Sequence, residues 1–332
     1  MIVPALPERG AGRFAPTPTG DLHLGNARTA LLAWLAAEAA GLRQILRVED
    51  LEPAAIPPGC LSGQYADLDW LGLRYDEDPR RGGPAGPYRQ SERFGAYDAV
   101  LRALDALGLL YPCWCSRREV RDAARAPHAS DEGPVYAGTC KPAHAVPLGD
   151  LGALPRRRGR VPALRLDAHA ALDRLALAEV TFEDAIAGPQ RFDVRGTMGD
   201  FVVRRRDGVA AYQIACAWDD AAMGCTQVLR GADLLPSTAR QVLLLRLLDR
   251  PLPTYAHVGL VTGPDGTRLA KRDGAQSLRS LRERGHDATE VRALLASMSG
   301  LPATGDLREL TAAFDLGRLS PAPAALLGGG QD

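Results

Sequence analysis

The sequence lacks both of the common glycine-rich patterns that bind nucleotide phosphates. No G-x-G-x-x-G follows a predicted strand, so nothing supports a dinucleotide-binding protein of the NAD type. No G-x-x-x-x-G-K-[ST] occurs anywhere in the chain, which excludes a P-loop nucleotide hydrolase. Any nucleotide site in this protein must therefore use a different loop.

Long apolar runs are also missing. No uninterrupted apolar segment is long enough to cross a bilayer, and no basic residues followed by an apolar stretch open the chain. The six cysteines are too unevenly spread for a disulfide scaffold and suit a reduced protein. We therefore expect a cytoplasmic protein that has no membrane partner.

Neither charge nor length narrows the function by itself. The 40 basic and 40 acidic residues balance, and a local basic patch would be enough to bind RNA. At about 150 residues per domain, 332 residues predict two domains or one domain with an insertion.

Three segments near the N-terminus predict a βαβ unit. A short strand begins at Gly12, an apolar helical face runs on from Asn26 to a glycine stop at Gly41, and a second strand covers residues 43–50. A strand, a helix and a strand in this order imply a parallel sheet and the α/β class.

Further along the chain, the pattern predicts a helix over residues 91–107 with Ser91 as its N-cap. Residues 111–160 are rich in proline, glycine, cysteine and arginine without a clean period, which favours an insertion. Residues 201–218 hold two apolar runs about an Asp207-Gly208 turn and predict a hairpin.

Two loops carry side chains suited to phosphate chemistry. His23 precedes the first helix and can donate to a phosphate oxygen, while Gly25 lets a ligand approach the backbone closely. Lys271 lies in a glycine-flanked basic loop, residues 268–272, and can stabilise charge on a departing pyrophosphate. Taken alone, each loop is equally typical of an exposed histidine or a solvated basic turn.

Together the two loops resemble the HIGH and KMSKS signatures of class I aminoacyl-tRNA synthetases. "HLGN" matches HIGH with Asn26 as its last residue, and "RLAKR" matches KMSKS with Arg268 and Ala270 as departures. The resemblance implies a Rossmann-like parallel sheet split by an insertion, with ATP as substrate, accompanied by Mg²⁺. It gives His23 and Lys271 catalytic roles and implies an ATP-binding set of His23, Gly25, Asn26 and Lys271.

The opening loop "RFAPTPTG" is similar to the R-F-A-P-S-P-T-G of glutamyl enzymes and differs from the R-F-P-P-E-P-N-G expected of glutaminyl ones. A guanidinium binds a carboxylate in bidentate fashion, so Arg13 is the candidate for the glutamate side chain. Glu49 can take the substrate ammonium. Taken alone, Arg13 could instead form a surface ion pair, and Tyr212, which the resemblance assigns to glutamate binding, could instead be an aromatic residue of the core. The resemblance implies a glutamate-binding set of Arg13, Phe14, Ala15, Pro16, Thr17, Glu49, Tyr212 and Arg230.

Three cysteines between residues 113 and 140 can supply thiolates to a tetrahedral zinc ion, which needs a fourth ligand. From the spacing alone they could also be free thiols, and His128 or His144 could complete the set. The pattern C-x-C followed by Y-x-x-x-C resembles that of the glutamyl-queuosine tRNA(Asp) synthetases, in which the tyrosine oxygen is a ligand. The resemblance therefore implies one structural Zn²⁺ on Cys113, Cys115, Tyr136 and Cys140.

The length also bears on the branch of the family. Only about sixty residues follow Lys271, too few for the helical anticodon-binding domain of a glutamyl-tRNA synthetase, so we expect none. We predict four segments: the first half of the catalytic domain, a zinc-containing insertion resembling an acceptor-binding subdomain, the second half of the catalytic domain, and the KMSKS-like loop with a short helical segment. Their ranges are 1–107, 108–195, 196–262 and 263–332.

The resemblance implies tRNA-independent activation of L-glutamate by ATP, followed by transfer to queuosine in the anticodon of tRNA(Asp), by a monomer. One alternative is a shortened glutamyl-tRNA synthetase that charges tRNA(Glu). Another is a non-catalytic, zinc-containing RNA-binding paralogue, for which Asn26 and Arg268 give the only basis. Basic runs at 156–158 and 204–206 are candidates for RNA phosphates, and are equally typical of solvated turns.

Overall fold

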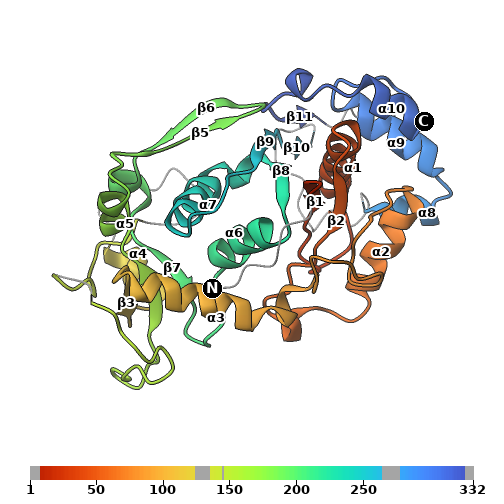
Figure 1. The fold of residues 1–332 in the computed structure, drawn as a ribbon. Coiled ribbons are helices and arrows are strands. Elements are labelled where there is room, and N and C mark those ends of the chain that lie inside the picture. Colours follow the sequence, from red (N-terminus) through yellow and green to blue (C-terminus); the bar gives the residue numbers. More distant parts are fainter. Residues whose placement is uncertain (1–7, 124–134, 144–145, 264–276, 326–332) are drawn as a thin grey trace.

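A six-stranded, mostly parallel sheet forms the centre of the molecule (Figure 1). The computed structural model describes residues 8–123, 135–143, 146–263 and 277–325. Five of the six strands are parallel and one edge strand is antiparallel. In spatial order they are β2 (Arg43–Leu46), β1 (Ala11–Phe14), β8 (Cys225–Gly231), β9 (Thr254–Val258), β5 (Val180–Asp184) and the antiparallel β6 (Gly188–Phe192). The predicted α/β class is confirmed.

Helix α1 (Leu24–Ala39) connects β1 to the parallel strand β2, which confirms the predicted βαβ unit. The helix begins at Leu24, and Gly41, with a φ of +64°, lies just past its end. Gly12 lets the helix approach the sheet, because a Cβ at this position would lie 2.5 Å from the Cβ of Ala37.

Helices cover both faces of the sheet, and alternate strand residues enter two separate cores. Val228 and Tyr255 pack with α3 (Phe94–Ala106), α6 (Tyr212–Ala222) and α7 (Leu235–Leu247). Leu229 and Ala256 pack with α1, α2 (Cys60–Trp70) and three C-terminal helices. Those helices are α8 (Leu278–Glu283), α9 (Ala288–Ser297) and α10 (Leu307–Ala313). No helix among the described residues is long and apolar enough to span a bilayer.

A second, three-stranded antiparallel sheet lies beside the first. It consists of β3 (Leu110–Cys113), β4 (Ala163–Leu166) and β7 (Phe201–Arg204). The predicted division into four segments stays a prediction, and hydrogen bonding links the segment 108–195 to both sheets. Residues 110–113 and 163–166 belong to the smaller sheet, whereas β5 and β6 belong to the larger one.

The remaining elements are short. The helices are α4 (Arg117–Ala123) and α5 (Ala168–Arg174), and the strands β10 (Val261–Thr262) and β11 (Ala324–Ala325) pair in parallel. Single turns of 3₁₀ helix cover Pro53–Ala55, Gln90–Glu92, Ala232–Leu234 and Leu316–Arg318, and a π-helical turn covers Val194–Met198.

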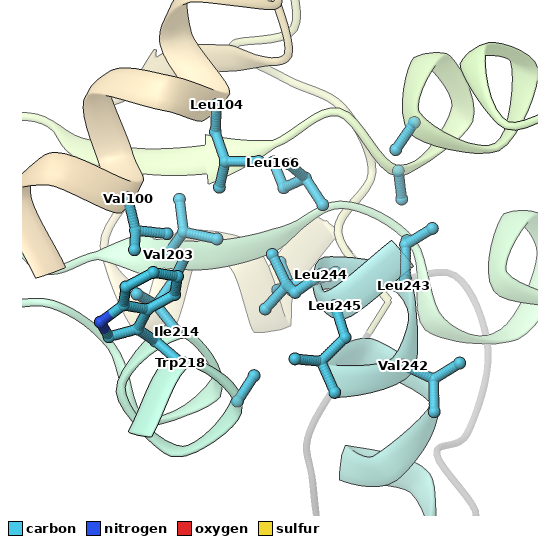
Figure 2. Packing of buried hydrophobic residues seen from close by; sticks show 14 of the residues in the cluster. Val100, Leu104, Leu166, Val203, Ile214, Trp218, Val242, Leu243, Leu244 and Leu245 are labelled. Carbon is cyan, nitrogen blue, oxygen red and sulfur yellow. The ribbon is translucent and has the colours of Figure 1, made fainter. Parts of the chain in front are cut away.

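The hairpin predicted over residues 201–218 is wrong in its second half, which is helix α6. The turn forms, since the N–H of Ala211 donates to the carbonyl of Val203. Beyond it, Ile214 and Trp218 repeat at the helical spacing and pack into the core with Val203 and with Val100 of α3 (Figure 2). A short apolar run is compatible with both the spacing of a strand and that of a helix, and here burial of one helical face favours the helix.

The helix expected over residues 91–107 is α3, and it begins three residues later than predicted. Ser91 is not its N-cap, because the Ser91 N–H and hydroxyl both donate to the carboxylate of Asp50. The strand predicted over residues 43–50 ends at Leu46, so Asp50 lies in the segment that follows β2. The acidic end of that segment therefore holds the turn before α3.

Asp67 of α2 is fully buried at the contact between α2 and α8. The nearest cationic atom is Nη1 of Arg282, 3.6 Å from its Oδ1. Burial raises the pKa of Asp67 to about 6, against a smaller opposing effect of Arg282. Because this value exceeds the ordinary one, ionisation of Asp67 at neutral pH destabilises the fold.

We predict that Asp67→Asn stabilises the protein at pH 8 by about 1 kcal/mol, allowing for screening by Arg282 and solvent. The gain should shrink as the pH falls from 6 toward 3.8 and vanish below about pH 3, where Asp67 is protonated in both the folded and the unfolded chain. Thermal unfolding at several pH values measures this, and Asp69→Asn on the exposed side of α2 is the control. A less stable Asp67→Asn at pH 8 would mean that the Arg282 pair outweighs burial.

Candidate active site

A cavity of about 330 Å³ lies at the carboxyl ends of β1 and β8. Ligands of open parallel sheets bind at this edge, because the strands there lead into the loops that carry functional side chains. Its lining contains every described residue of the predicted glutamate and ATP sets. These are Arg13, Phe14, Ala15, Pro16, Thr17, His23, Gly25, Asn26, Glu49, Tyr212 and Arg230. Lys271 and the loop 268–272 lie outside the described residues.

Arg13 is buried on the cavity wall, 5% exposed, so the alternative of a surface ion pair is wrong. Its Nε lies 3.1 Å from Oδ1 of Asp220 and its Nη2 3.5 Å from Oδ2. One edge of the guanidinium is therefore taken by Asp220. The other edge, formed by Nη1 and Nη2, is the one that a carboxylate ligand can use in bidentate fashion.

Asp220 also binds a second buried guanidinium, that of Arg47. Nη1 of Arg47 lies 2.6 Å from Oδ1 of Asp220, and Nη2 lies 3.0 Å from Oε1 of Glu49. Burial would raise the pKa of Asp220, but Arg13 and Arg47 outweigh it and hold that pKa at about 2. Arg13, Asp220, Arg47 and Glu49 thus form a buried chain of alternating charge that ends at the cavity.

Glu49 and Tyr212 line the same cavity from different elements. Burial raises the pKa of Glu49 in spite of Arg47, so a cation beside it in the cavity would stabilise its carboxylate. Burial also raises the pKa of Tyr212, which keeps its phenol neutral and able to donate a hydrogen bond. Tyr212 opens α6 and is half-buried at the cavity instead of being a core aromatic.

Arg230 comes from β8 and is held on two sides. Its Nη2 donates to Oγ1 of Thr238 at 2.6 Å and to Oε1 of Gln241 at 2.7 Å. Its Nε donates to Nε2 of His257 at 3.2 Å. Its side chain is therefore fixed in the cavity wall before any ligand binds.

His23 is the N-cap of α1. Its Nδ1 accepts from the backbone N–H groups of Gly25 and Asn26, at 3.1 and 3.3 Å. An accepting Nδ1 means that the imidazole is neutral and carries its hydrogen on Nε2, the atom that can donate to a ligand.

Beyond residues 264–276 the chain lies beside His23. Ser277, the first described residue after 264–276, forms an antiparallel bridge with His23, and the Leu278 N–H donates to Leu22. Nη2 of Arg279 lies 2.9 Å from Oδ1 of Asp21. The segment that begins at Ser277 therefore lies beside the loop that precedes α1.

The Sγ atoms of Cys113, Cys115 and Cys140 lie within 4.8 Å of one another, and those of Cys115 and Cys140 are 3.5 Å apart. Oη of Tyr136 lies 3.4 Å from Sγ of Cys113 and 3.7 Å from Sγ of Cys115. Thiolates about 2.3 Å from a tetrahedral zinc ion are separated by about 3.8 Å, so this spacing fits the ion. His128 and His144 lie outside the described residues.

The basic run 204–206 is engaged within the protein. All three guanidinium groups hydrogen-bond to other residues of the chain, and Arg206 donates to the carbonyl oxygens of Trp114 and Cys115. All three arginines are half-buried, and in the part of the chain that the structure describes Arg206 alone of the three hydrogen-bonds to the loop of the cysteine cluster. The run at 156–158 is exposed, with Arg157 stacked on the ring of Trp114.

Comparison with known proteins identifies the family. Residues 11–311 match the family of tRNA synthetases class I (E and Q), catalytic domain. The chain belongs to this family. Its predicted resemblance to class I synthetases is confirmed, and the parallel sheet with its cavity at the strand ends is the synthetase catalytic fold.

Similar synthetases include two curated relatives and one solved structure. The chain is 50% identical over 323 residues to the glutamyl-Q tRNA(Asp) synthetase of Symbiobacterium thermophilum, covering 95% of both chains. It is 46% identical over 290 residues to the protein of the same name from Nitratidesulfovibrio vulgaris, covering 87% of this chain and 86% of that one. A glutamate-tRNA synthetase from Elizabethkingia anophelis superposes with a TM-score of 0.77 at 26% identity, covering 97% of this chain and 68% of that one.

Sequence reasoning missed the residues behind the cavity wall of this synthetase, chiefly Arg47, Asp220 and His257. All three are at least 98% buried. The sequence did hold one indication of them: each is a charged or polar residue at a position where the apolar pattern of its strand or helix predicts a buried side chain. Arg47 follows "QIL" in β2, Asp220 lies in the apolar helix α6, and His257 lies within the apolar strand β9.

We predict that Asp220→Asn destabilises the synthetase at pH 7 by about 3–5 kcal/mol, because two buried guanidinium groups lose their shared counter-charge. The stability from Asp220 is present above about pH 4 and is lost as the pH falls through 3.8 toward 2, so the deficit narrows only in acid. Urea unfolding measures it, with the exposed Asp98→Asn as control. A deficit below 1 kcal/mol would refute the counter-charge role.

Proposed function

We propose that this synthetase activates L-glutamate with ATP and then transfers the glutamate to the queuosine base in the anticodon of tRNA(Asp). One observation carries the proposal. Arg13 and His23, from the two ends of one loop, line a single cavity with Glu49, Tyr212 and Arg230. The relatives that match nearly the whole chain, named glutamyl-Q tRNA(Asp) synthetases, support the same reaction and acceptor.

In the first step the residues of the cavity bind and orient the substrates. The open edge of Arg13 takes the side-chain carboxylate of glutamate, and Glu49 takes its ammonium group. Tyr212 and Arg230 hold the remainder of the amino acid. An oxygen of the α-carboxylate then attacks the α-phosphorus of ATP, the bond to the leaving pyrophosphate breaks, and glutamyl-adenylate forms.

Charge stabilisation and positioning carry this step without a protein nucleophile. The Nε2–H of His23 donates to a phosphate oxygen, next to the backbone at Gly25 and Asn26. Lys271 stabilises the negative charge on the leaving pyrophosphate, and Mg²⁺ accompanies ATP as part of the substrate. In the second step a hydroxyl on the cyclopentene ring of queuosine attacks the adenylate carbonyl, and AMP leaves.

The decisive experiment measures two activities of the purified protein. Glutamate-dependent exchange between pyrophosphate and ATP should proceed without tRNA, and labelled glutamate should pass only to RNA that contains queuosine. Label on the 3′ end of tRNA(Glu) would favour a glutamyl-tRNA synthetase. Absence of both exchange and transfer would leave an RNA-binding paralogue.

Within that assay, Arg13→Ala should lower exchange about 100-fold or more, because the side-chain carboxylate of glutamate then loses the guanidinium that binds it, and Asp220 loses one of its two arginine partners. The exposed Arg74→Ala should exchange like the wild type. Near-normal exchange by Arg13→Ala would refute the assigned role of Arg13.

We also propose one structural zinc ion on Cys113, Cys115, Tyr136 and Cys140. Their spacing supports it, and the ion would tie β3 to residues 136–140 in a part of the chain with little apolar core. We further propose a cytoplasmic monomer.

Metal analysis of the purified protein should find about one zinc per chain. Cys115→Ser should lose the metal and become more sensitive to proteolysis within residues 108–162, whereas Cys60→Ser, outside the cluster, should retain it. A metal-free wild type that is equally resistant to proteolysis would mean that the cluster is three free thiols.

A further inference from the structure

His257 and Asp184 form a buried pair behind Arg230 that the proposed mechanism does not yet use. His257 of β9 is fully buried, and Asp184 of the neighbouring strand β5 is 3% exposed. Nδ1 of His257 lies 2.5 Å from Oδ2 of Asp184. Neither side chain lines the cavity, so any effect on a ligand must pass through Arg230.

The surroundings of Asp184 fix which nitrogen of His257 carries the hydrogen. Oδ1 of Asp184 accepts from the backbone N–H groups of His257, Ile186 and Ala187, at 3.1, 3.0 and 2.8 Å. Burial would raise the pKa of Asp184, but the bonds from His257 and Ala187 hold it at about 2. An ionised carboxylate only accepts, so Nδ1 of His257 must donate to it.

The opposite nitrogen then presents a lone pair to Arg230. Burial lowers the pKa of His257 even though Asp184 opposes the shift, so the imidazole is neutral and its Nε2 is an acceptor. Nε2 receives the Nε–H of Arg230 at 3.2 Å and lies 2.9 Å from the hydroxyl of Thr238.

These contacts leave one nitrogen of Arg230 for a ligand. Nε is taken by His257, and Nη2 by Thr238 and Gln241. Nη1 has only the thiol of Cys216, at 3.8 Å, as a partner among the described residues. Arg230 can therefore donate to a ligand from Nη1 alone, and the direction of that nitrogen depends on the bond to His257.

We propose that Asp184 and His257 are positioning residues for Arg230. Asp184 holds His257 in the tautomer with its hydrogen on Nδ1, and the free lone pair of Nε2 turns Nη1 of Arg230 toward the bound amino acid. The inference rests on the proposed activation of glutamate and deepens it. A buried histidine that only fills space would require neither this tautomer nor an acceptor at Nε2.

Two amide substitutions of His257 separate these possibilities. Asn places its amide near Nδ1, where it can still bond to Asp184, but it has no acceptor at the position of Nε2. Gln is longer and can place its amide oxygen there. We expect His257→Asn to raise the KM for glutamate in pyrophosphate exchange about 10-fold, the loss of one bond to a charged group. His257→Gln should raise it less than 3-fold, and the KM for ATP should not change in either variant.

Asp184→Asn tests the tautomer in a nearly isosteric way. The three backbone donors require an oxygen at the position of Oδ1, so the amide NH₂ must face Nδ1 of His257. Nδ1 then becomes an acceptor, the hydrogen moves to Nε2, and two N–H groups oppose each other at Arg230. The KM for glutamate should rise as in His257→Asn. In ¹⁵N-histidine NMR spectra, His257 should carry its hydrogen on Nδ1 in the wild type and on Nε2 in Asp184→Asn.

The outcomes keep this inference apart from the proposed function. A wild type without exchange refutes glutamate activation, while the NMR spectrum still tests the tautomer. A hydrogen on Nε2 in the wild type overturns the inference, as does an unchanged glutamate KM in His257→Asn. Equal rises in the KM values for glutamate and ATP would indicate general damage and also overturn it. If Asp184→Asn does not fold, the His257→Asn and His257→Gln pair decides, with unfolding temperatures compared between the two.

Discussion

Asp220 is the negative charge that two buried guanidinium groups share, those of Arg13 and of Arg47, and Glu49 gives Arg47 a second acidic partner. Arg13 comes from β1, Arg47 from the end of β2 and Asp220 from α6, so one carboxylate joins three elements. The pairing leaves Arg13 with one occupied edge and one open edge. Removal of a shared counter-charge from a buried network costs several kcal/mol, so the position of Arg13 and the stability of this part of the fold have the same origin.

The alternation of residues along β8 and β9 determines where the cavity can be. Val228 and Tyr255 enter one core while Leu229 and Ala256 enter the other, so both faces of the sheet are closed by helices. A ligand can then reach only the ends of the strands, where Arg13 of β1, Arg230 of β8 and His23 in the loop after β1 line the cavity. The apolar pattern of two strands thus places the polar site.

The βαβ unit over residues 11–46 could be predicted because the helical spacing of its apolar residues agrees with the glycine that ends the helix. The site residues between 13 and 26 could be predicted because they lie together in one short stretch of sequence. Arg47, Asp220 and His257 could not, since their partners come from distant segments and only the fold brings them together. The hairpin prediction was wrong at α6, because a short apolar run there fits both the alternation of a strand and the spacing of a helix. The roles of the lining residues and the zinc ion stay predictions, and Lys271 lies outside the described residues.

Gly12 has a consequence for the far end of α1. The helix rests directly on the sheet near Ala37, and its 16 residues extend about 24 Å to the turn that His23 caps. A side chain at position 12 would push the C-terminal end of α1 away from the sheet and tilt the helix, which would move His23 at its N-terminal end within the cavity. Selection for an enzyme with altered substrate choice should therefore leave position 12 untouched, although Gly12 does not line the cavity.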